Sequence, residues 1–404
     1  MPTLVQINVT ANWGSTGRIA EEIGIEAIQH GWHSIIAYGR QANPSQSELI
    51  RIGSNFDIYA HLLGTRLFDL HGLMSSRATK ALVKRLKEIE PDIIHLHNIH
   101  GYYLNYPILF EYLKQTHIPI VWTLHDCWGF TGHCGHFVYK GCDRWKKQCH
   151  HCPLTKAYPK SLWMDRSKES YKLKKNLLST FNNLHIVTVS QWLANMAQQS
   201  FLGIHPIQCI YNGIDTSIFK YKECKSQVCQ RLNISPEKRI LLGVSNVWTD
   251  SKGLPDYLKL RELLSNDFVI VLVGMNKKSI KSLPDGIIGI ERTGNLEELV
   301  ALYSSADVVL SLSSAETFGL TIAEGMACGI PSIVYNNTSQ PELITNETGA
   351  VVKQGDITGL VDTIISICSR KKELFHAACR SRVANHFNKV EQYKKYLDLY
   401  QSLI

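Results

Sequence analysis

Residues 314–329 read SAETFGLTIAEGMACG, in which two glutamates, Glu316 and Glu324, stand eight positions apart around a Phe-Gly-Leu turn. The preceding residues 307–312 are apolar and β-branched, which predicts a buried parallel strand. Apolar residues then recur at helical spacing and predict a helix over residues 319–328. Glu316 is therefore expected in a strand-to-helix loop, and Glu324 within the helix.

The start of this helix is suited to an anion. The peptide N–H groups of Gly319, Leu320 and Thr321 have no acceptor in the helix, and the helix dipole favours negative charge there. Carboxylates at Glu316 and Glu324 can accept hydrogen bonds from hydroxyl groups. Such a phosphate cradle beside two carboxylates matches a nucleotide-sugar, although the glutamate spacing taken alone also fits coincidence.

Together with the Phe-Gly-Leu turn and the trailing Met-Ala-Cys-Gly-Ile-Pro, the Glu-x7-Glu pattern resembles the signature of family 4 glycosyltransferases. This resemblance implies a GT-B fold, in which two Rossmann-like domains face each other across a cleft. It also implies that Glu324 binds the ribose hydroxyls and Glu316 those of the transferred sugar. The donor-binding residues implied on this stretch are Glu316, Thr317, Phe318, Gly319, Leu320, Thr321 and Glu324.

Composition indicates an ordinary globular protein of two or three domains: the chain has 404 residues, of which 44% are hydrophobic and 19% charged. The N-terminus lacks the basic region and cleavage site of a signal peptide, and no apolar run reaches the length of a membrane span. We therefore expect a cytoplasmic protein. The net charge of +8 favours anionic substrates or an anionic membrane surface, and it also suits a plain soluble protein.

Part of the positive charge lies in residues 163–178, where lysines and arginines alternate with aromatic and leucine residues. This pattern fits a basic amphipathic helix at a membrane interface, and equally a solvated helix face. The residues concerned are Trp163, Arg166, Lys168, Tyr171, Lys172, Lys174, Lys175, Leu177 and Leu178.

Strand and helix patterns alternate along the whole chain, which predicts α/β architecture with doubly wound parallel sheets. Strands are expected at residues 4–9, 34–38, 92–97, 118–124, 185–189, 207–211, 239–245, 267–273, 287–290, 307–312 and 331–334. Helices are expected at residues 18–30, 79–90, 191–200, 254–264, 295–304 and 319–328. The pattern restarts after an Asn-Gly turn at residues 212–213, the best linker signal in the chain.

We therefore predict three segments. Residues 1–213 form an acceptor-binding Rossmann-like domain with a Cys-rich insertion at 127–152, and residues 214–385 form a nucleotide-sugar-binding one. Residues 386–404 form an amphipathic helix, which the family resemblance implies crosses back to the first domain. Ligands of such sheets bind at the carboxyl ends of the strands.

Further donor-binding residues are expected after two strands of the second domain. Lys252 precedes a helix start and can neutralise a leaving diphosphate, though an exposed loop lysine is the alternative. Family members often carry an arginine six residues earlier, where this chain has Asn246. The loop containing Arg292 and Thr293 lies along the nucleobase in the family, and Arg292 is a candidate to replace the missing charge.

In the first domain, the strand at 4–9 leads into Gly14-Ser15-Thr16-Gly17-Arg18, with glycines that let a backbone approach a phosphate. This position resembles the family's N-terminal glycine loop, so Gly14, Gly17 and Arg18 are assigned to donor binding. Two glycines in a turn are otherwise a weak signal.

Histidines follow two strands of the first domain. The resemblance places His125 against the donor sugar as a catalytic residue, with Asp126 as its partner or that of the acceptor; a loop-stabilising histidine is the alternative. His95 and His97 share one side of their strand, as metal ligands would need, but lining the cleft or ordinary packing is the better interpretation.

Five of the eleven cysteines fall between Cys127 and Cys152. Without a secretory signal, disulfides are disfavoured, and a closed structural zinc site is the better interpretation than free thiols. The expected ligands are Cys134, Cys142, Cys149 and Cys152.

The sequence thus predicts a retaining hexosyltransferase with His125, Lys252 and Glu316 as catalytic residues and no catalytic metal. It would move a sugar from a UDP- or GDP-sugar to a glycan or lipid-linked oligosaccharide in capsule, exopolysaccharide or lipopolysaccharide assembly. No nucleic acid is expected as a partner, and attachment to the inner face of the cell membrane is compatible with the basic segment. The alternatives are a nucleotide-sugar 2-epimerase of similar fold and a non-catalytic binding subunit.

Overall fold

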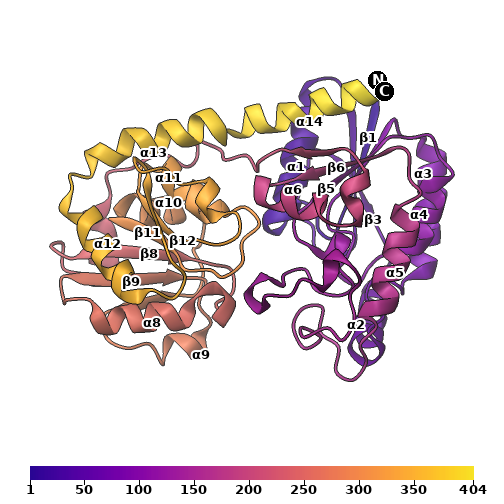
Figure 1. The fold of residues 1–404 in the computed structure, drawn as a ribbon. Helices are drawn as coiled ribbons and strands as arrows, with labels where there is room; N and C mark the ends of the chain where they lie inside the picture. The colour runs from indigo at the N-terminus through magenta and orange to yellow at the C-terminus, as the bar shows by residue number, and fades with distance from the viewer. The chain divides into compact units, whose positions relative to one another are not determined.

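The structure, a computed structural model, describes residues 1–404 and divides into two compact units. Unit 1 comprises Met1–Tyr211 and Val390–Ile404, and unit 2 comprises Asn212–Lys389. Each is a parallel α/β sheet covered by helices on both faces (Figure 1). The α/β fold class expected from the alternating pattern is confirmed.

Unit 1 contains seven strands and most of the long helices of the first half of the chain. Its strands are β1 (Thr3–Asn8), β2 (His33–Tyr38), β3 (Glu48–Arg51), β4 (Ile93–Leu96), β5 (Ile120–Leu124), β6 (Leu184–Thr188) and β7 (Ile207–Cys209). Its helices are α1 (Gly14–Gln29), α2 (Asn55–Phe68), α3 (Ser76–Ile89), α4 (Tyr106–Lys114), α5 (Ser167–Leu178) and α6 (Gln191–Gln198).

The sheet of unit 1 has the order β3-β2-β1-β4-β5-β6-β7, and every neighbouring pair is parallel. Its strands read as apolar runs because both faces are buried. Helix α1 covers one face, while α4 packs on the other through Phe110 against Trp122 of β5 (Figure 1). Strand β3 was not expected, because ELIR is short, half-exposed and polar at both ends.

The helix expected at residues 386–404 is α14 (Lys389–Leu403), and a separate helix, α13 (Glu373–His386), precedes it. Helix α14 buries Tyr393, Tyr396, Leu397 and Tyr400 in the core that α1 and the strands of unit 1 share (Figure 1). Tyr400 also donates a 2.6 Å hydrogen bond to His95 Nδ1. The last fifteen residues thus complete the hydrophobic core of the N-terminal sheet.

Unit 2 holds the second sheet. Its strands are β8 (Arg239–Val244), β9 (Phe268–Val273), β10 (Ile287–Ile290), β11 (Val308–Ser311), β12 (Ser332–Tyr335) and β13 (Gly349–Val352). Its helices, besides α13, are α7 (Lys225–Leu232), α8 (Leu254–Leu263), α9 (Lys277–Ile280), α10 (Leu296–Ser305), α11 (Leu320–Ala327) and α12 (Ile357–Ser369).

The sheet of unit 2 has the order β10-β9-β8-β11-β12-β13, again all parallel. Helices α8 and α12 pack together on one face, and α10, α11 and α13 on the other (Figure 1). Every strand expected in this part of the chain is present within two residues of its expected bounds. None of the helices in the structure has the length and hydrophobicity that crossing a membrane requires.

Candidate functional site

The strand order of unit 2 marks one position for a ligand. From β8 the chain moves outward to β9 on one side, and β11 lies on the other side. A crevice forms where strand order reverses in this way, at the carboxyl ends of the two strands. The loops that follow β8 and β11 contain Lys252 and Glu316, so the topology brings together two residues that are far apart in sequence.

Backbone contacts hold these two loops against each other. The N–H of Ser314 donates to the carbonyl of Ser251 at 2.8 Å. Gly253 has φ +80°, and a Cβ there would lie 2.2 Å from the carbonyl oxygen of Leu312. A glycine is therefore required for the loop to pass this close to the end of β11.

The side chain of Lys252 meets that of Glu316 at this point. Lys252 Nζ donates to Glu316 Oε1 at 2.6 Å, with the two side chains 34% and 23% exposed. The main chain of Glu316 is also fixed, because its N–H donates to Thr338 Oγ1 and its carbonyl accepts from Ser339. The pair is thus rigidly placed and still open to solvent.

Glu324 lies on the fifth residue of α11, as expected, and Tyr303 of α10 donates a 2.8 Å hydrogen bond to its Oε2 atom. Burial of Tyr303, together with the neighbouring carboxylate, raises the pKa of its hydroxyl well above the ordinary value. Tyr303 therefore remains a hydrogen-bond donor and fixes one oxygen of Glu324. Sequence reasoning missed Tyr303, which has no motif and comes from a different helix.

The N-terminus of α11 supplies unpaired peptide groups. Gly319 is its N-cap in the left-handed conformation, and Leu320 and Thr321 are its first residues, whose N–H groups have no acceptor within the helix. Phe318 is buried and packs edge-on against Phe387, so only its backbone can serve a ligand. Thr317 is half-buried at the same turn.

Three other residues expected at the donor side lie in exposed or half-exposed loops. Asn246 follows β8 and is exposed, and Arg292 and Thr293 follow β10. Strand β10 is the edge strand beyond β9, so this loop lies farther along the sheet from the Lys252–Glu316 pair.

Unit 1 has its own reversal of strand order at β1, between β2 and β4. Helix α1 begins at Gly14, so the two glycines lie in its first turn rather than in a loop before it. A Cβ at Gly17 would lie 2.7 Å from Thr10 Oγ1, whereas one at Gly14, with φ +65°, would meet nothing within 4 Å. Packing therefore accounts for Gly17, while Gly14 and Arg18 remain exposed.

His125 follows β5 and belongs to a chain of three polar side chains. Gln6 donates its amide to the carbonyl of Ala20, which turns its Oε1 atom toward His97 Nε2 at 3.0 Å. His97 Nε2 therefore has the proton, and its Nδ1 accepts from His125 Nε2 at 3.0 Å. Burial lowers the pKa of His125 to about 4, so this tautomer persists as the neutral ring at physiological pH.

Asp126, the next residue, is occupied on both oxygens. Its Oδ2 atom lies 3.0 Å from His100 Nε2, and its Oδ1 accepts from the N–H of Trp128 at 2.8 Å. Burial raises the pKa of Asp126, but the charge and hydrogen bond of His100 outweigh it and hold the pKa well below the ordinary value. Asp126 thus partners His100 in the structure.

His95 and His97 lie side by side, with ring centroids 3.9 Å apart, as the strand alternation predicted. His95 is held between Thr123 Oγ1 and the hydroxyl of Tyr400, at 2.7 and 2.6 Å. It is an ordinary core residue that anchors α14, and the metal-ligand alternative is not supported.

The basic segment before and within α5 differs from the expected amphipathic helix. Trp163 is 78% exposed, but Tyr171, Leu178 and Lys174 are buried. Lys174 donates to the carbonyls of Trp128 and Thr131, at 2.7 and 3.0 Å. The apolar side of this helix therefore faces the protein core, and the burial of Lys174 was expected neither of a helix at a membrane interface nor of a solvated helix face.

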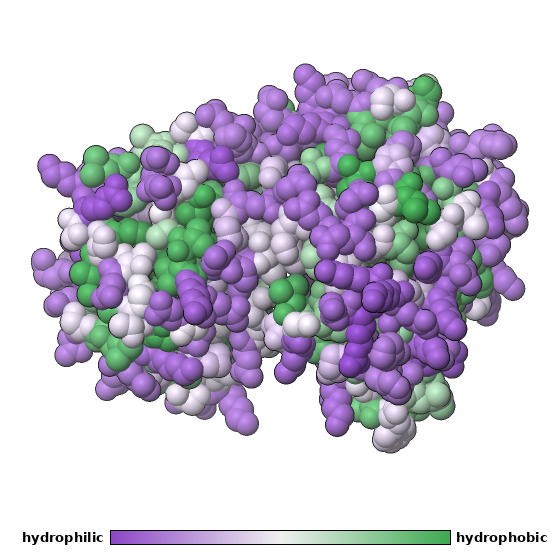
Figure 2. Space-filling model, in the orientation of Figure 1, coloured by the Kyte–Doolittle hydropathy of each residue, from purple (hydrophilic) through white to green (hydrophobic).

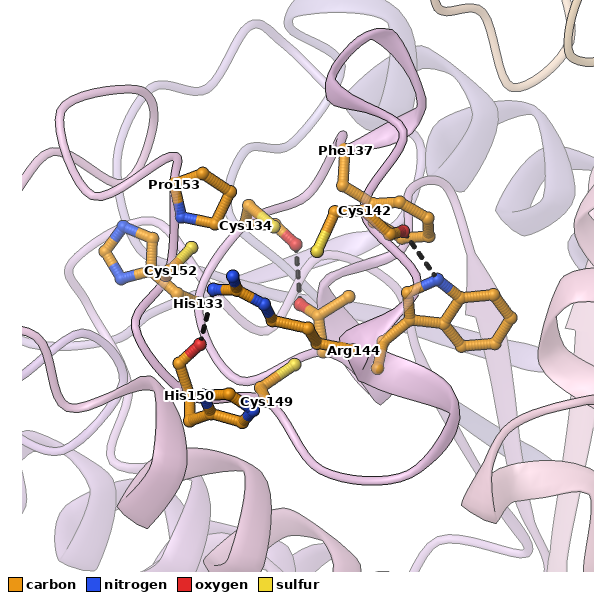
Figure 3. A pocket seen from close by; sticks show the side chains of 11 residues that line it. His133, Cys134, Phe137, Cys142, Arg144, Cys149, His150, Cys152 and Pro153 are labelled. Carbon is orange, nitrogen blue, oxygen red and sulfur yellow. Dashed lines mark hydrogen bonds between the residues drawn. The ribbon is translucent and has the colours of Figure 1, made fainter.

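The four clustered cysteines line one pocket of unit 1 and are all free thiols (Figure 3). A hydrogen bond between two of them raises the pKa of Cys134 and lowers that of Cys152 to about 7. No group of three or more His, Cys, Asp or Glu side chains is arranged in the structure so as to hold a metal ion.

Two family models match the chain, one over each unit. The model described as glycosyl transferases group 1 matches residues 229–382, and that described as glycosyltransferase family 4 matches residues 16–218, half of the chain. The chain belongs to glycosyltransferase family 4. It is a glycosyltransferase of the GT-B type, as the resemblance implied.

One similar protein spans nearly the whole of this family 4 chain, and another spans about half of it. A putative colanic acid biosynthesis glycosyl transferase, WcaC of Escherichia coli, is 23% identical over 99% of this chain and 100% of its own. N-acetyl-alpha-D-glucosaminyl L-malate synthase of Bacillus anthracis is 28% identical over 54% of this chain and 58% of its own.

Solved GT-B structures superpose on the whole chain. The sucrose-phosphate synthase of Thermosynechococcus elongatus does so with a TM-score of 0.73 at 18% identity, covering 100% of this chain and 99% of its own. Anabaena HepE, solved in complex with UDP, gives a TM-score of 0.68 at 16% identity, with 100% of both chains covered. At these identities the likeness confirms the fold. The family assignment decides for a transferase over a nucleotide-sugar 2-epimerase.

Proposed function

We propose that this glycosyltransferase moves a hexose from a UDP- or GDP-sugar to a hydroxyl of a glycan or lipid-linked oligosaccharide, with retention of configuration. The place of this reaction is capsule, exopolysaccharide or lipopolysaccharide assembly, at the cytoplasmic face of the membrane. The main observation behind this proposal is the Lys252–Glu316 pair, which lies where the strand order of unit 2 reverses and beside the N-terminus of α11. The colanic acid relative supports the polysaccharide setting.

The donor's diphosphate would bind at Lys252 and the free peptide groups of Leu320 and Thr321. Lys252 supplies a full positive charge, and the helix start adds peptide dipoles of fixed orientation. This arrangement requires no catalytic divalent ion. Glu324, held at one oxygen by Tyr303, would accept from the ribose hydroxyls with the other.

Glu316 would change partners when the donor binds. In the structure Lys252 occupies its Oε1 atom. Once the diphosphate attracts Lys252, Glu316 becomes available to accept hydrogen bonds from the sugar hydroxyls. The pair is thus a preformed contact that the donor exchanges for two charge-assisted contacts of its own.

The state of Asp126, the acidic residue expected in unit 1, bears on how retention would be achieved. Both oxygens of Asp126 are engaged, which leaves it unsuited to form a covalent sugar intermediate. In a same-face mechanism, the bond from C1 to the phosphate oxygen breaks as the acceptor oxygen bonds to C1. The acceptor's proton moves to the departing phosphate, so no enzyme nucleophile is needed.

His125 would serve the acceptor side as a neutral group. The chain from Gln6 through His97 fixes its proton on Nε2. A neutral ring can bond a sugar hydroxyl without adding a second positive charge near the oxocarbenium-like transition state. His125 would thus position rather than protonate.

Membrane attachment is supported by α2 rather than by α5. Phe56, Tyr59 and Leu63 lie on one face of α2 and are 79%, 69% and 59% exposed. The N–H of Leu162 donates to the carbonyl of Arg66, near the end of this helix, which places the exposed Trp163 nearby. Figure 2 shows apolar side chains at the end of unit 1 where Figure 1 places α2.

This apolar face would insert into a bilayer of anionic lipids. Arg51 contacts Asn55 at the start of α2, and Arg66 lies near its end, so cations flank the apolar residues. Partial insertion of aromatic side chains with flanking cations is how amphipathic helices bind anionic interfaces.

The proposed reaction is tested by supplying the purified protein with UDP- and GDP-sugars and lipid extract from its host. A donor that raises the melting temperature should be consumed only when acceptor is present. The anomeric signal of the product in NMR then gives the configuration. Consumption of donor with inversion would contradict retention, and no stabilising donor in the panel would contradict the nucleotide-sugar assignment.

A further inference from the structure

The pocket formed by the inserted segment of unit 1 has features that the transfer reaction does not use. It is lined by the four thiols of Cys134, Cys142, Cys149 and Cys152, and has a volume of about 10 Å³. A space of this size holds about one water-sized particle. Figure 3 shows the four sulfur atoms around this pocket, with the Arg144 guanidinium among them in this view.

We propose that these four cysteines bind one Zn²⁺ ion as a tetrathiolate, and that the ion holds the inserted segment against the acceptor side of unit 1. Zinc binding releases the four thiol protons, so the site becomes a dianion: Zn²⁺ plus four thiolates. Four-coordinate sites of this kind are closed and structural. The thiols line the pocket without yet forming a ligand set, so binding requires rotation of their side chains.

His133 provides an observation independent of the cysteines. Its Nδ1 atom lies 2.9 Å from Asp69 Oδ1, and its side chain is 1% exposed. Its Nε2 atom is buried without any partner, and the residue lines the same pocket. A buried N–H without an acceptor is costly, so a group that it could bond is expected here. A metal-bound thiolate of the neighbouring Cys152 supplies that acceptor (Figure 3).

Cations around the pocket suit a dianion and not four neutral thiols. Lys174 is 1% exposed and forms no ion pair; its ammonium donates to two carbonyls and lies 3.3 Å from the ring centroid of Trp128. One of those carbonyls belongs to Thr131, a residue of the pocket wall. Burial disfavours the charged form of a lysine that has no counter-charge, and the zinc tetrathiolate would provide that counter-charge to Lys174.

Backbone contacts already resemble those of a thiolate site. The N–H of Gly132 donates to Cys149 Sγ at 3.2 Å, and Arg144 donates to the carbonyls of His150 and His151 between the last two cysteines. Hydrogen bonds to the sulfur orient a ligand, and the arginine holds the turn that brings Cys149 and Cys152 to one side.

The ion would position Asp126 and His100. The N–H of Cys127 donates to the carbonyl of Gly135, directly after Cys134, at 2.9 Å. A Cβ at Gly135 would lie 3.0 Å from Asp126 Oδ2, so this turn packs closely on the carboxylate. Fixing Cys134 therefore fixes the turn that holds Asp126 toward His100.

The test is metal analysis of the full-length protein, purified under reducing conditions from zinc-supplemented cells. We expect about one zinc per chain, lost in Cys142→Ser and Cys149→Ser. Cys127→Ala, which removes a buried thiol of the same segment outside the pocket, should keep it. Folded, reduced wild type that neither contains zinc nor takes it up would overturn the proposal, as would a Cys134–Cys152 disulfide in the active protein.

Cobalt substitution keeps the test decisive if the serine variants fail to fold. Co²⁺ in the wild type should give tetrahedral absorption with the charge-transfer intensity of four thiolates, and His133→Gln should keep that count. A three-thiolate spectrum would contradict the ligand set. Nucleotide binding by unit 2 should be unchanged when zinc is removed, so failure of the zinc proposal and failure of the donor proposal are separable.

Discussion

Lys252 Nζ lies 2.6 Å from Glu316 Oε1, joining loops that follow two adjacent strands and are sixty-four residues apart in sequence. The contact is between half-exposed side chains, so it contributes little to folding; exposed ion pairs are worth about 0–1 kcal/mol. The contact instead positions the two side chains, because it holds a cation and a hydrogen-bond acceptor at the start of α11, where a diphosphate would bind.

Glu316→Gln should reduce transfer at least about tenfold while leaving the fold intact. The substitution keeps the shape but removes the charge from hydrogen bonds to the sugar, each worth about 1.5–3 kcal/mol when charge-assisted. The initial rate of nucleotide release with acceptor measures the effect. Glu347→Gln, at an exposed position of unit 2, is the control and should behave as wild type. Normal polymer made by Glu316→Ala cells would instead indicate a non-catalytic binding subunit.

Tyr303→Phe should weaken nucleotide binding while preserving the rate at saturating donor. Without the 2.8 Å bond from Tyr303, the Glu324 carboxylate loses the partner that orients it for ribose. We expect a several-fold rise in KM for the donor, and a loss of unfolding free energy of about 1 kcal/mol. Tyr335→Phe is a matched control, since its hydroxyl bonds Asp256 instead. Equal effects of both substitutions on KM would argue against a role for Glu324.

The free energy of unfolding should fall as pH is lowered from 7 to 5.5. Burial lowers the pKa of His95 and His97 well below 6.5 and that of His125 to about 4. In the unfolded chain these rings take up protons below about pH 6.5, which the folded protein excludes, and each such group can cost up to about 1.4 kcal/mol per pH unit. Urea denaturation at the two pH values measures the loss.

One buried histidine, His133, has the opposite effect on the pH dependence of the free energy of unfolding. Burial lowers the pKa of His133, but Asp69 outweighs it and raises the pKa above 6.5, so His133 contributes stability that is lost as pH rises. A stability that is flat or increases between pH 7 and 5.5 would show that the buried histidines are not neutral as described.

Phe56→Ser combined with Leu63→Ser should abolish binding to vesicles of phosphatidylglycerol. Burying each apolar side chain in the bilayer contributes about 1.5–3 kcal/mol, so losing two should weaken co-sedimentation well over tenfold. Leu374→Ser, which removes a side chain 61% exposed in unit 2, is the control. Binding that survives the double substitution, or that is absent in the wild type, would rule out α2 as the attachment site.

Much of the fold could be predicted from the sequence because buried parallel strands consist of runs of apolar residues. The strand before Glu316 could be predicted from its own apolar residues, and the turn after Lys252 from its glycine. The hydrogen-bond partners of the site residues could not be predicted in this way. Tyr303 contacts Glu324, and Gln6 contacts His97, only because elements distant in sequence pack together. Lys174 illustrates the limit, since a lysine in a basic run is expected in solvent, and here it is buried beneath the inserted segment. The periodicity of apolar residues predicts which side chains can face a core. The order of the strands in the sheet, which the sequence does not show, determines which side chains come into contact.

The most direct test of the central claim is calorimetric titration of UDP and of GDP into wild type and Lys252→Ala. We predict that one of the two nucleotides binds the wild type and binds Lys252→Ala at least about tenfold more weakly, since a cation to a phosphate is worth about 1.5–3 kcal/mol. The same nucleotide should bind Glu316→Gln nearly as wild type, because Glu316 is assigned to the sugar. Unchanged affinity in Lys252→Ala, or no binding of either nucleotide to the wild type, would contradict the account.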